Sequence, residues 1–213
     1  MADKLKIAVL ASGRGSNFQA LLESIETGLI RNAGVVCVIS NNSDAGVLTI
    51  ARSKNIPAHH ISRKQFRTDA EFNNTILNVL SMYEVNFIVL TGYMKLLDVS
   101  IIERFQKRII NIHPALLPQF GGKGMYGRFV HDAVIASGAK FSGATVHIVD
   151  GIYDHGSIVL QERIALDENE TSETLAAKVL EIEHRILPQA VRLFAEGKVE
   201  ITNGKIKIQN NDG

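Results

Sequence analysis

The chain has 213 residues and a mass of 23.3 kDa, which is enough for one sizeable α/β domain and too little for two. Its 23 basic and 22 acidic side chains nearly cancel, so the net charge predicts binding neither to nucleic acid nor to a membrane surface. A single cysteine excludes an intrachain disulfide and multi-cysteine metal sites, and no apolar run reaches the roughly 18 residues of a membrane span. We therefore expect one cytoplasmic domain that acts on small molecules.

The N-terminal half alternates apolar runs with segments of helical periodicity. Unbroken apolar runs predict buried strands over 6–11, 34–40, 58–61 and 86–91. Apolar residues three and four apart predict a helix that Ser16 or Asn17 caps and Gly28 ends, a helix from Asp44 through Ala51, and a helix over 69–82. Such alternation predicts an α/β fold with an open, doubly wound, mostly parallel sheet and helices on both faces.

Beyond Arg108 the pattern changes. The sequence predicts a strand over 109–113, a glycine-rich loop over 121–127, a helix over 129–137, and paired strands over 143–149 and 158–164. A helical stretch runs from Thr171 to about Gly197, and we expect Pro188 to interrupt it. A C-terminal hairpin over 199–208 turns at Asn203-Gly204. We expect one domain, residues 1–213, with a phosphate-binding half (1–108) and a half that carries more of the chemistry (109–213).

The loop Gly13-Arg-Gly-Ser-Asn17 joins the first predicted strand to the first predicted helix. Backbone N–H groups and the helix dipole favour an anion at such a place. The loop is neither a P-loop nor a complete dinucleotide fingerprint, because it lacks the Gly-Lys-Ser/Thr run of the first and the third glycine of the second. It predicts either one phosphate group, bound by the loop amides with Ser16 and Asn17, or a tight turn that only caps the helix.

Asn111 and His113 lie two apart in a predicted strand, so both side chains project from one face of the sheet. Pro114 ends this strand at the edge where open α/β sheets bind ligands. An amide can donate to an oxyanion, and a histidine can move a proton near neutral pH. Asp154 in the later loop can complete the group, whereas we expect Asp150 to cap its own turn. The alternative is that the amide and the imidazole only satisfy local backbone groups.

We expect structural roles for the remaining histidines and for Cys37, which lies in a predicted strand. No histidine has the spacing of a metal site, so we expect no metal. The other histidines lie on an edge-like strand (His59 and His60), on helices (His131 and His184) and on a later strand (His147).

Four segments carry a family resemblance. They are Gly15-Ser-Asn17, Gly92-Tyr-Met-Lys-Leu-Leu97, Asn111-Ile-His-Pro-Ala-Leu-Leu-Pro118, and Gly143-Ala-Thr-Val-His147 with the later Asp154-His-Gly156. Together they resemble the glycinamide ribonucleotide (phosphoribosylglycinamide) formyltransferases of the folate-dependent formyltransferase superfamily, over nearly the whole chain. The resemblance implies transfer of the formyl group of 10-formyltetrahydrofolate to the amine of glycinamide ribonucleotide in purine synthesis. We expect a monomer or weak homodimer whose partners are these two small molecules.

The resemblance also implies roles for single residues of this chain. Asn111, His113 and Asp154 match the family's catalytic triad, in which Asp154 helps to protonate His113. Residues 109–213 are then the catalytic and folate-binding half. The family often has an arginine that helps to bind the formyl-folate where this chain has Asp69, so Arg67 or Arg63 is expected to substitute for it. The other implied site residues are Gly15, Ser16 and Asn17 for the substrate phosphate, Glu183 for the glycinamide, and Met94, Lys95, Leu96, Leu97 and Asn111 for the folate.

Two other functions stay open at the level of the sequence. One is a binding module that senses a phosphorylated metabolite without catalysis. The other is a deformylase, in which water accepts the formyl group. The glycine-rich loop over 121–127 is either a mobile lid or a long surface loop.

Overall fold

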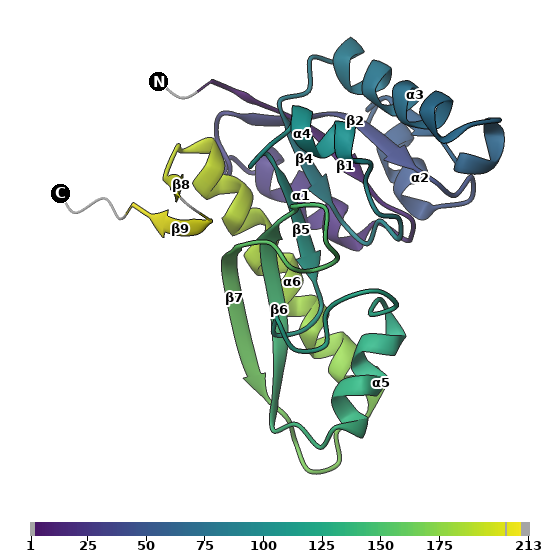
Figure 1. Cartoon of the computed structure of the whole chain (residues 1–213). Coiled ribbons are helices and arrows are strands. Elements are labelled where there is room, and N and C mark those ends of the chain that lie inside the picture. Colours follow the sequence, from purple (N-terminus) through teal and green to yellow (C-terminus); the bar gives the residue numbers. More distant parts are fainter. Residues whose placement is uncertain (1–2, 203, 210–213) are drawn as a thin grey trace.

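A seven-stranded sheet forms the centre of the computed structural model, which describes residues 3–202 and 204–209 (Figure 1). Neighbouring strands follow the order β3-β2-β1-β4-β5-β6-β7. The first five in this order are parallel, whereas β6 and β7 run antiparallel to their neighbours. The strands are β1 (Leu5–Leu10), β2 (Ala33–Ser40), β3 (Ala58–His60), β4 (Phe87–Leu90), β5 (Ile109–His113), β6 (Phe141–Ile148) and β7 (Ile158–Ala165). The prediction of an open, mostly parallel sheet is confirmed.

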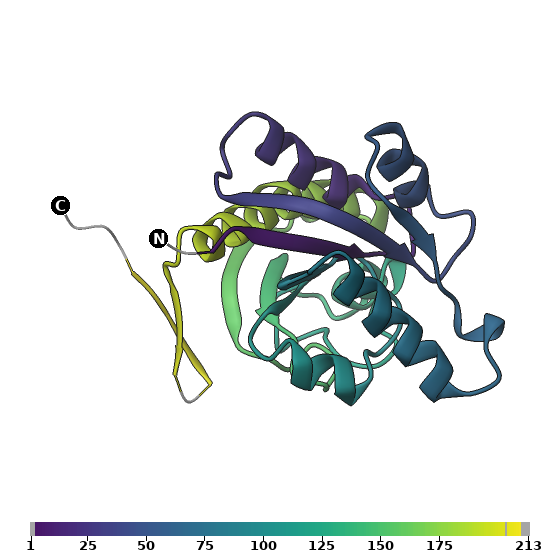
Figure 2. The same ribbon diagram turned by 90° about the horizontal axis from the view of Figure 1, so that it is seen from above.

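Helices cover both faces of this sheet (Figure 2). One face packs against α1 (Ser16–Glu26), α2 (Gly46–Ser53), α5 (Arg128–Ala136) and α6 (Ser172–Ala195). The other face packs against α3 (Asp69–Met82) and α4 (Val99–Arg104), and a short 3₁₀ turn, Arg63–Gln65, precedes α3. A separate two-stranded sheet, β8 (Val199–Thr202) and β9 (Lys205–Ile208), follows α6. This confirms the C-terminal hairpin, although Asn203 of its expected turn lies outside the described residues.

The strands form because their residues alternate between two apolar cores. In β1, Ile7 and Val9 belong to the core under α1 and α6, whereas Ala8 and Leu10 belong to the core under α3 and α4. Both sets are fully buried, as expected for parallel strands that are covered on both faces. Cys37 of β2 lies in the second core. Burial raises the pKa of its thiol to about 12, which supports the expected packing role and opposes a nucleophilic one.

Helix α6 runs without interruption through Pro188, so the predicted break is wrong. Ile186, Leu187 and Ala190, close to the proline on both sides, are buried in the core. Packing of this apolar face holds the helix together across the hydrogen bond that the proline cannot donate. In the described part of the chain, no helix is long and apolar enough to cross a bilayer.

Helix starts also differ from the predictions. Gly15, with φ 89°, is the N-cap of α1, and neither Ser16 nor Asn17 caps this helix through its side chain. A Cβ atom on Gly15 would lie 2.8 Å from the Cα atom of Val47, so the close approach of the loop to α2 requires glycine. Helix α2 begins at Gly46 rather than at Asp44. The short helix α4 has no sequence prediction.

Candidate functional site

A cavity of about 780 Å³ opens where the carboxyl ends of the parallel strands meet, as expected for open α/β sheets. Its walls come from both halves of the chain: the loop after β1, the stretch after β4, the end of β5, the loop before α5, the loop after β6, and α6. Predicted site residues on these walls are Gly15, Ser16, Asn17, Met94, Lys95, Leu96, Leu97, Asn111, His113, Asp154 and Glu183. The fold therefore brings the predicted phosphate, folate and catalytic residues into one cavity.

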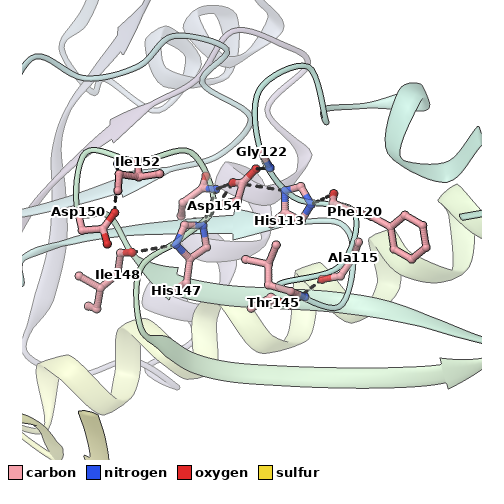
Figure 3. Close-up of polar contacts among 12 residues, drawn as sticks. His113, Ala115, Phe120, Gly122, Thr145, His147, Ile148, Asp150, Ile152 and Asp154 are labelled. Atoms are coloured by element: carbon pink, nitrogen blue, oxygen red, sulfur yellow. Dashed lines mark hydrogen bonds and ion pairs between the residues drawn. The ribbon is translucent and has the colours of Figure 1, made fainter. Parts of the chain in front are cut away.

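The side chains of Asn111, His113 and Asp154 converge as their sequence spacing predicts. The Asp154 Oδ1 atom lies 3.5 Å from His113 Nδ1 and 3.4 Å from Asn111 Nδ2. The neighbours of these strand residues, Ile110 and Ile112, face the opposite core. Figure 3 shows the carboxylate of Asp154 between the two histidine rings, His113 on one side and His147 on the other. The three predicted residues thus form one polar cluster at the end of β5.

His113 is held through its second nitrogen. Its Nε2 atom lies 2.8 Å from the carbonyl oxygen of Phe120 (Figure 3). A carbonyl only accepts, so Nε2 carries the proton in the neutral ring, and Nδ1 presents its lone pair toward Asp154. Burial lowers the pKa of His113, although Asp154 and the Phe120 carbonyl oppose this shift. Burial therefore favours the neutral imidazole, whereas Asp154 favours the imidazolium, and a protonated His113 stays a prediction.

His147 is a site residue that the sequence analysis missed. Its Nδ1 atom lies 2.8 Å from the carbonyl oxygen of Ile148, and its Nε2 atom lies 3.1 Å from Asn111 Nδ2. Nδ1 must donate to the carbonyl, so Nε2 accepts a hydrogen bond from the amide of Asn111. His147 enters the site because β5 and β6 pair antiparallel, in a register that places His147 opposite Asn111. Sequence spacing alone does not reveal this register. His131, also expected to be structural, is buried in the cavity wall.

Asp154 is ionised in this site. Burial raises the pKa of its carboxyl group, but a proton on His147 or His113 and the N–H of Gly122 act in the opposite direction and hold the pKa below the usual value. Its Oδ2 atom accepts a hydrogen bond from Gly122 N at 2.9 Å. The carboxylate thus joins the histidines to the glycine-rich loop. Asp150, by contrast, accepts from Ile152 N at 3.1 Å, in agreement with its predicted role within the turn.

Asn17 and Glu183 join the phosphate loop to α6. The Asn17 Nδ2 atom donates to Glu183 Oε2 at 2.7 Å, so this amide group is already engaged by the protein. Burial raises the pKa of Glu183 to about 7, and the hydrogen bond from Asn17 acts in the opposite direction. A phosphate at this loop would therefore meet the backbone N–H groups at the start of α1 and the Ser16 side chain. The side chain of Asn17 instead orients a carboxyl group that titrates near neutral pH.

The structure does not bring Arg67 into the cavity. Arg67 is exposed and is not one of the residues on the cavity wall. Arg63 forms an ion pair with Asp69 and donates to the Phe66 carbonyl at 2.8 Å. The predicted contact of Arg67 with folate stays a prediction that the geometry of this cavity does not support. The cationic side chains on the wall are those of Arg14, Lys95, Lys123 and Arg128.

The resting site contains the parts for acyl transfer. Amide N–H groups can stabilise an oxyanion, and a neutral imidazole beside a carboxylate can accept and pass on a proton. Within the described residues, no three His, Cys, Asp or Glu side chains are grouped as metal ligands.

Comparison with known proteins identifies close relatives. Residues 5–191 match the family model described as formyl transferase. The chain is 42% identical to the chloroplastic phosphoribosylglycinamide formyltransferase of Arabidopsis thaliana over 97% of its own length and 70% of the relative. It is 38% identical to the phosphoribosylglycinamide formyltransferase of Haemophilus influenzae, over 92% and 90% of the two chains. The crystal structure of glycinamide ribonucleotide transformylase 1 from Symbiobacterium toebii superposes with a TM-score of 0.91 at 36% identity, covering 99% and 96% of the chains.

Proposed function

Because this chain belongs to the formyl transferase family, we propose that it transfers the formyl group of 10-formyltetrahydrofolate to the primary amine of glycinamide ribonucleotide, a step of de novo purine synthesis. The observation that carries the proposal is the shared cavity. It holds a helix N-terminus suited to a phosphate and the cluster of Asn111, His113 and Asp154 suited to acyl transfer. Relatives with 38% and 42% identity are named for this reaction.

The reaction forms one carbon–nitrogen bond and breaks another. The neutral amine of the ribonucleotide attacks the formyl carbon, and the carbonyl oxygen becomes the oxyanion of a tetrahedral intermediate. Collapse of this intermediate breaks the bond to N10 of the folate. The proton lost by the attacking amine passes to N10, so the formylated amide and tetrahydrofolate are released without any other reactant.

Asn111 serves as the oxyanion donor. Its Nδ2 atom has two hydrogens, of which one is held by His147 Nε2 at 3.1 Å. The second points to Asp154 Oδ1 across a long contact of 3.4 Å, and this hydrogen is the one that turns to the oxyanion. Such donors contribute roughly 3–4 kcal/mol to transition-state stabilisation. His147 acts as a positioning residue, because it keeps the N–H side of the amide toward the reacting carbon.

His113 carries the proton. Its Nδ1 lone pair accepts the proton that the amine loses, directly or through water, and the imidazolium then faces Asp154 Oδ1. The ionised carboxylate stabilises this cation, and the same Nδ1–H can then donate its proton to N10. Phe120 holds the ring at Nε2 throughout, since its carbonyl accepts from that nitrogen in both protonation states.

The ribonucleotide phosphate binds at the loop of Gly15 and Ser16, and Glu183 contacts the glycinamide part. We expect Asn17→Ala to raise the apparent KM for the ribonucleotide about tenfold and to leave the KM for the folate within twofold. The reason is that Glu183 loses its 2.7 Å hydrogen bond, which raises the pKa of this buried carboxyl further. Steady-state kinetics with each substrate varied in turn measure both values.

Gln19→Ala is the matched control, because Gln19 lies on the same helix and bonds to the exposed Glu23. It should leave both KM values unchanged. Equal increases of the two KM values in Asn17→Ala would contradict the assignment of this loop to the ribonucleotide.

The folate lies against the stretch from Met94 to Leu97, and its formyl group reaches Asn111. Met94 and Leu96 are each 47% exposed at the cavity, so their apolar side chains are free to contact a ring. The glycine-rich loop over 121–127 acts as a lid over this region: Gly122 N–H bonds to Asp154, and Phe120, just before the loop, bonds to His113. Arg67 stays the predicted additional folate contact.

One assay separates this function from its two alternatives. The protein is mixed with 10-formyltetrahydrofolate, with and without glycinamide ribonucleotide, and tetrahydrofolate is measured. We expect tetrahydrofolate only when the ribonucleotide is present. Release of tetrahydrofolate and formate without the ribonucleotide would identify a deformylase, and no release in either mixture would identify a binding module.

Three further features are part of the proposal. The enzyme works in the cytoplasm, although the name of the Arabidopsis relative places that protein in the chloroplast. It is a monomer or a weak homodimer. Its single domain combines a phosphate-binding half, residues 1–108, with a catalytic and folate-binding half, residues 109–213, and the folate wall around Met94 extends into the first half.

A further inference from the structure

Ser12 connects the two loops that face the two substrates. It lies two residues after the end of β1 and immediately before the phosphate loop. Its backbone N–H donates to the carbonyl of Gly92 at 3.1 Å, and its Oγ atom accepts from the backbone N–H of Met94 at 3.0 Å. Both partners belong to the stretch after β4. The proposed chemistry gives Ser12 no role, and Ser12 is not one of the residues on the cavity wall.

Asn41 fixes the direction in which the Ser12 hydroxyl points. The Oγ–H of Ser12 donates to Asn41 Oδ1 at 2.5 Å. A serine hydroxyl has one hydrogen and two lone pairs, so once the hydrogen is committed to Asn41, the lone pairs are left for Met94 N–H. Asn41 follows β2, Ser12 follows β1 and Met94 follows β4, and these three strands are neighbours in the sheet. The chain of hydrogen bonds therefore crosses the carboxyl edge of the sheet.

The stretch over 92–97 has few other attachments. Tyr93 and Leu97 are buried and anchor its two sides. The residues between them, 94–96, are exposed. In the described part of the chain, the two hydrogen bonds recorded for this stretch both end on Ser12. Ser12 therefore adds polar contacts at the start of this stretch to the packing of Tyr93 and Leu97.

We infer that Ser12 and Asn41 are positioning residues for the folate-binding wall: Asn41 orients the Ser12 hydroxyl, and this hydroxyl holds Met94 and the residues after it in the folate-binding position. The inference rests on the proposed function, since it takes the 92–97 stretch as the folate wall. It goes beyond that function by giving folate affinity to two residues outside the cavity.

Asn41→Leu tests this inference, because it removes the oxygen that accepts from the Ser12 hydroxyl and changes no residue of the cavity wall. We expect the KM for 10-formyltetrahydrofolate to rise about fivefold, equivalent to about 1 kcal/mol, the net contribution of one hydrogen bond. The KM for the ribonucleotide and kcat should stay within twofold of the wild type. Asn41→Asp keeps the acceptor oxygen and should restore the wild-type folate KM. Ser12→Ala removes both side-chain bonds and should raise the folate KM at least as much.

Asn42→Leu is the matched control, since Asn42 Oδ1 bonds only within its own turn, to Asp44 N at 3.2 Å, and should leave the folate KM unchanged. Titration of each variant with tetrahydrofolate alone should show the same order of affinities.

An unchanged folate KM in Ser12→Ala and Asn41→Leu, equal rises in both KM values, or no rescue by Asn41→Asp would each overturn the inference. If wild-type protein transfers formyl groups while these variants bind folate normally, only this inference fails. If the wild type neither binds folate nor transfers, the proposed function fails with it.

Discussion

Asn111→Ala and His113→Ala should each lower kcat by about 10²–10³-fold, with a much smaller change in folate affinity. Removal of one oxyanion donor has this effect in other acyl-transfer enzymes, and loss of a general acid–base group has an effect of similar size. Asn111 supplies the N–H group, and His113 supplies the Nδ1 atom that lies 3.5 Å from Asp154. Neither side chain belongs to the stretch from Met94 to Leu97, which we propose holds the folate. Single-turnover rates measured at saturating folate and ribonucleotide check this expectation.

His155→Ala provides the matched control for the histidine. His155 lies in the same loop as Asp154, but its side chain is 65% exposed and pairs with Asp150. The control should retain wild-type turnover. A full rate in Asn111→Ala or His113→Ala would remove that residue from the mechanism.

Replacing Asp154 by asparagine should lower kcat on the order of 10²–10⁴-fold, the range between loss of one oxyanion donor and loss of a carboxylate beside a catalytic histidine. Asparagine suits this position, because it tolerates the φ of 53° and its carbonyl oxygen can still accept from Gly122 N. The variant therefore removes the negative charge while leaving the backbone of the loop in place.

The same variant should shift the pH profile of kcat/KM in a defined direction. Burial lowers the pKa of His113, and Asp154 opposes that shift. Without the carboxylate the pKa of His113 falls further, so the ring stays neutral down to a lower pH. The acid limb of the profile, where protonation of His113 stops it from accepting a proton, should move to lower pH. Asp150→Asn, in the same loop, is the control, and an unmoved limb in Asp154→Asn would assign Asp154 a purely structural role.

Much of the fold follows from local patterns that the structure preserves. The alternation of apolar residues in β1 and β4 and the helical spacing over 69–82 depend only on neighbours in sequence, and α3 begins and ends at the predicted residues. Thr68 caps this helix by accepting from Glu71 N. Asn111 and His113 were predictable for the same reason, because residues two apart in a strand share a face.

What could not be predicted depends on contacts between distant segments. His147 joins the site through the register of β6 against β5, and one residue of slip would turn its side chain to the opposite face. The continuity of α6 through Pro188 depends on burial of the surrounding residues. The engagement of Asn17 depends on Glu183, 166 positions later in the chain. Each is a tertiary effect that no local motif encodes.

Helix α6 follows all seven strands of the main sheet along the chain, and it packs against α1, α5, β6 and β7. Leu175, Val179 and Ile182 of this helix complete the same core as Ile7 of β1. A nascent chain that ends before Thr171 therefore leaves that side of the sheet uncovered and lacks the wall that carries Glu183. On the ribosome the first strands are made before α6 and expose apolar surface to chaperones or to neighbouring chains, and the cavity lacks one wall until α6 has emerged.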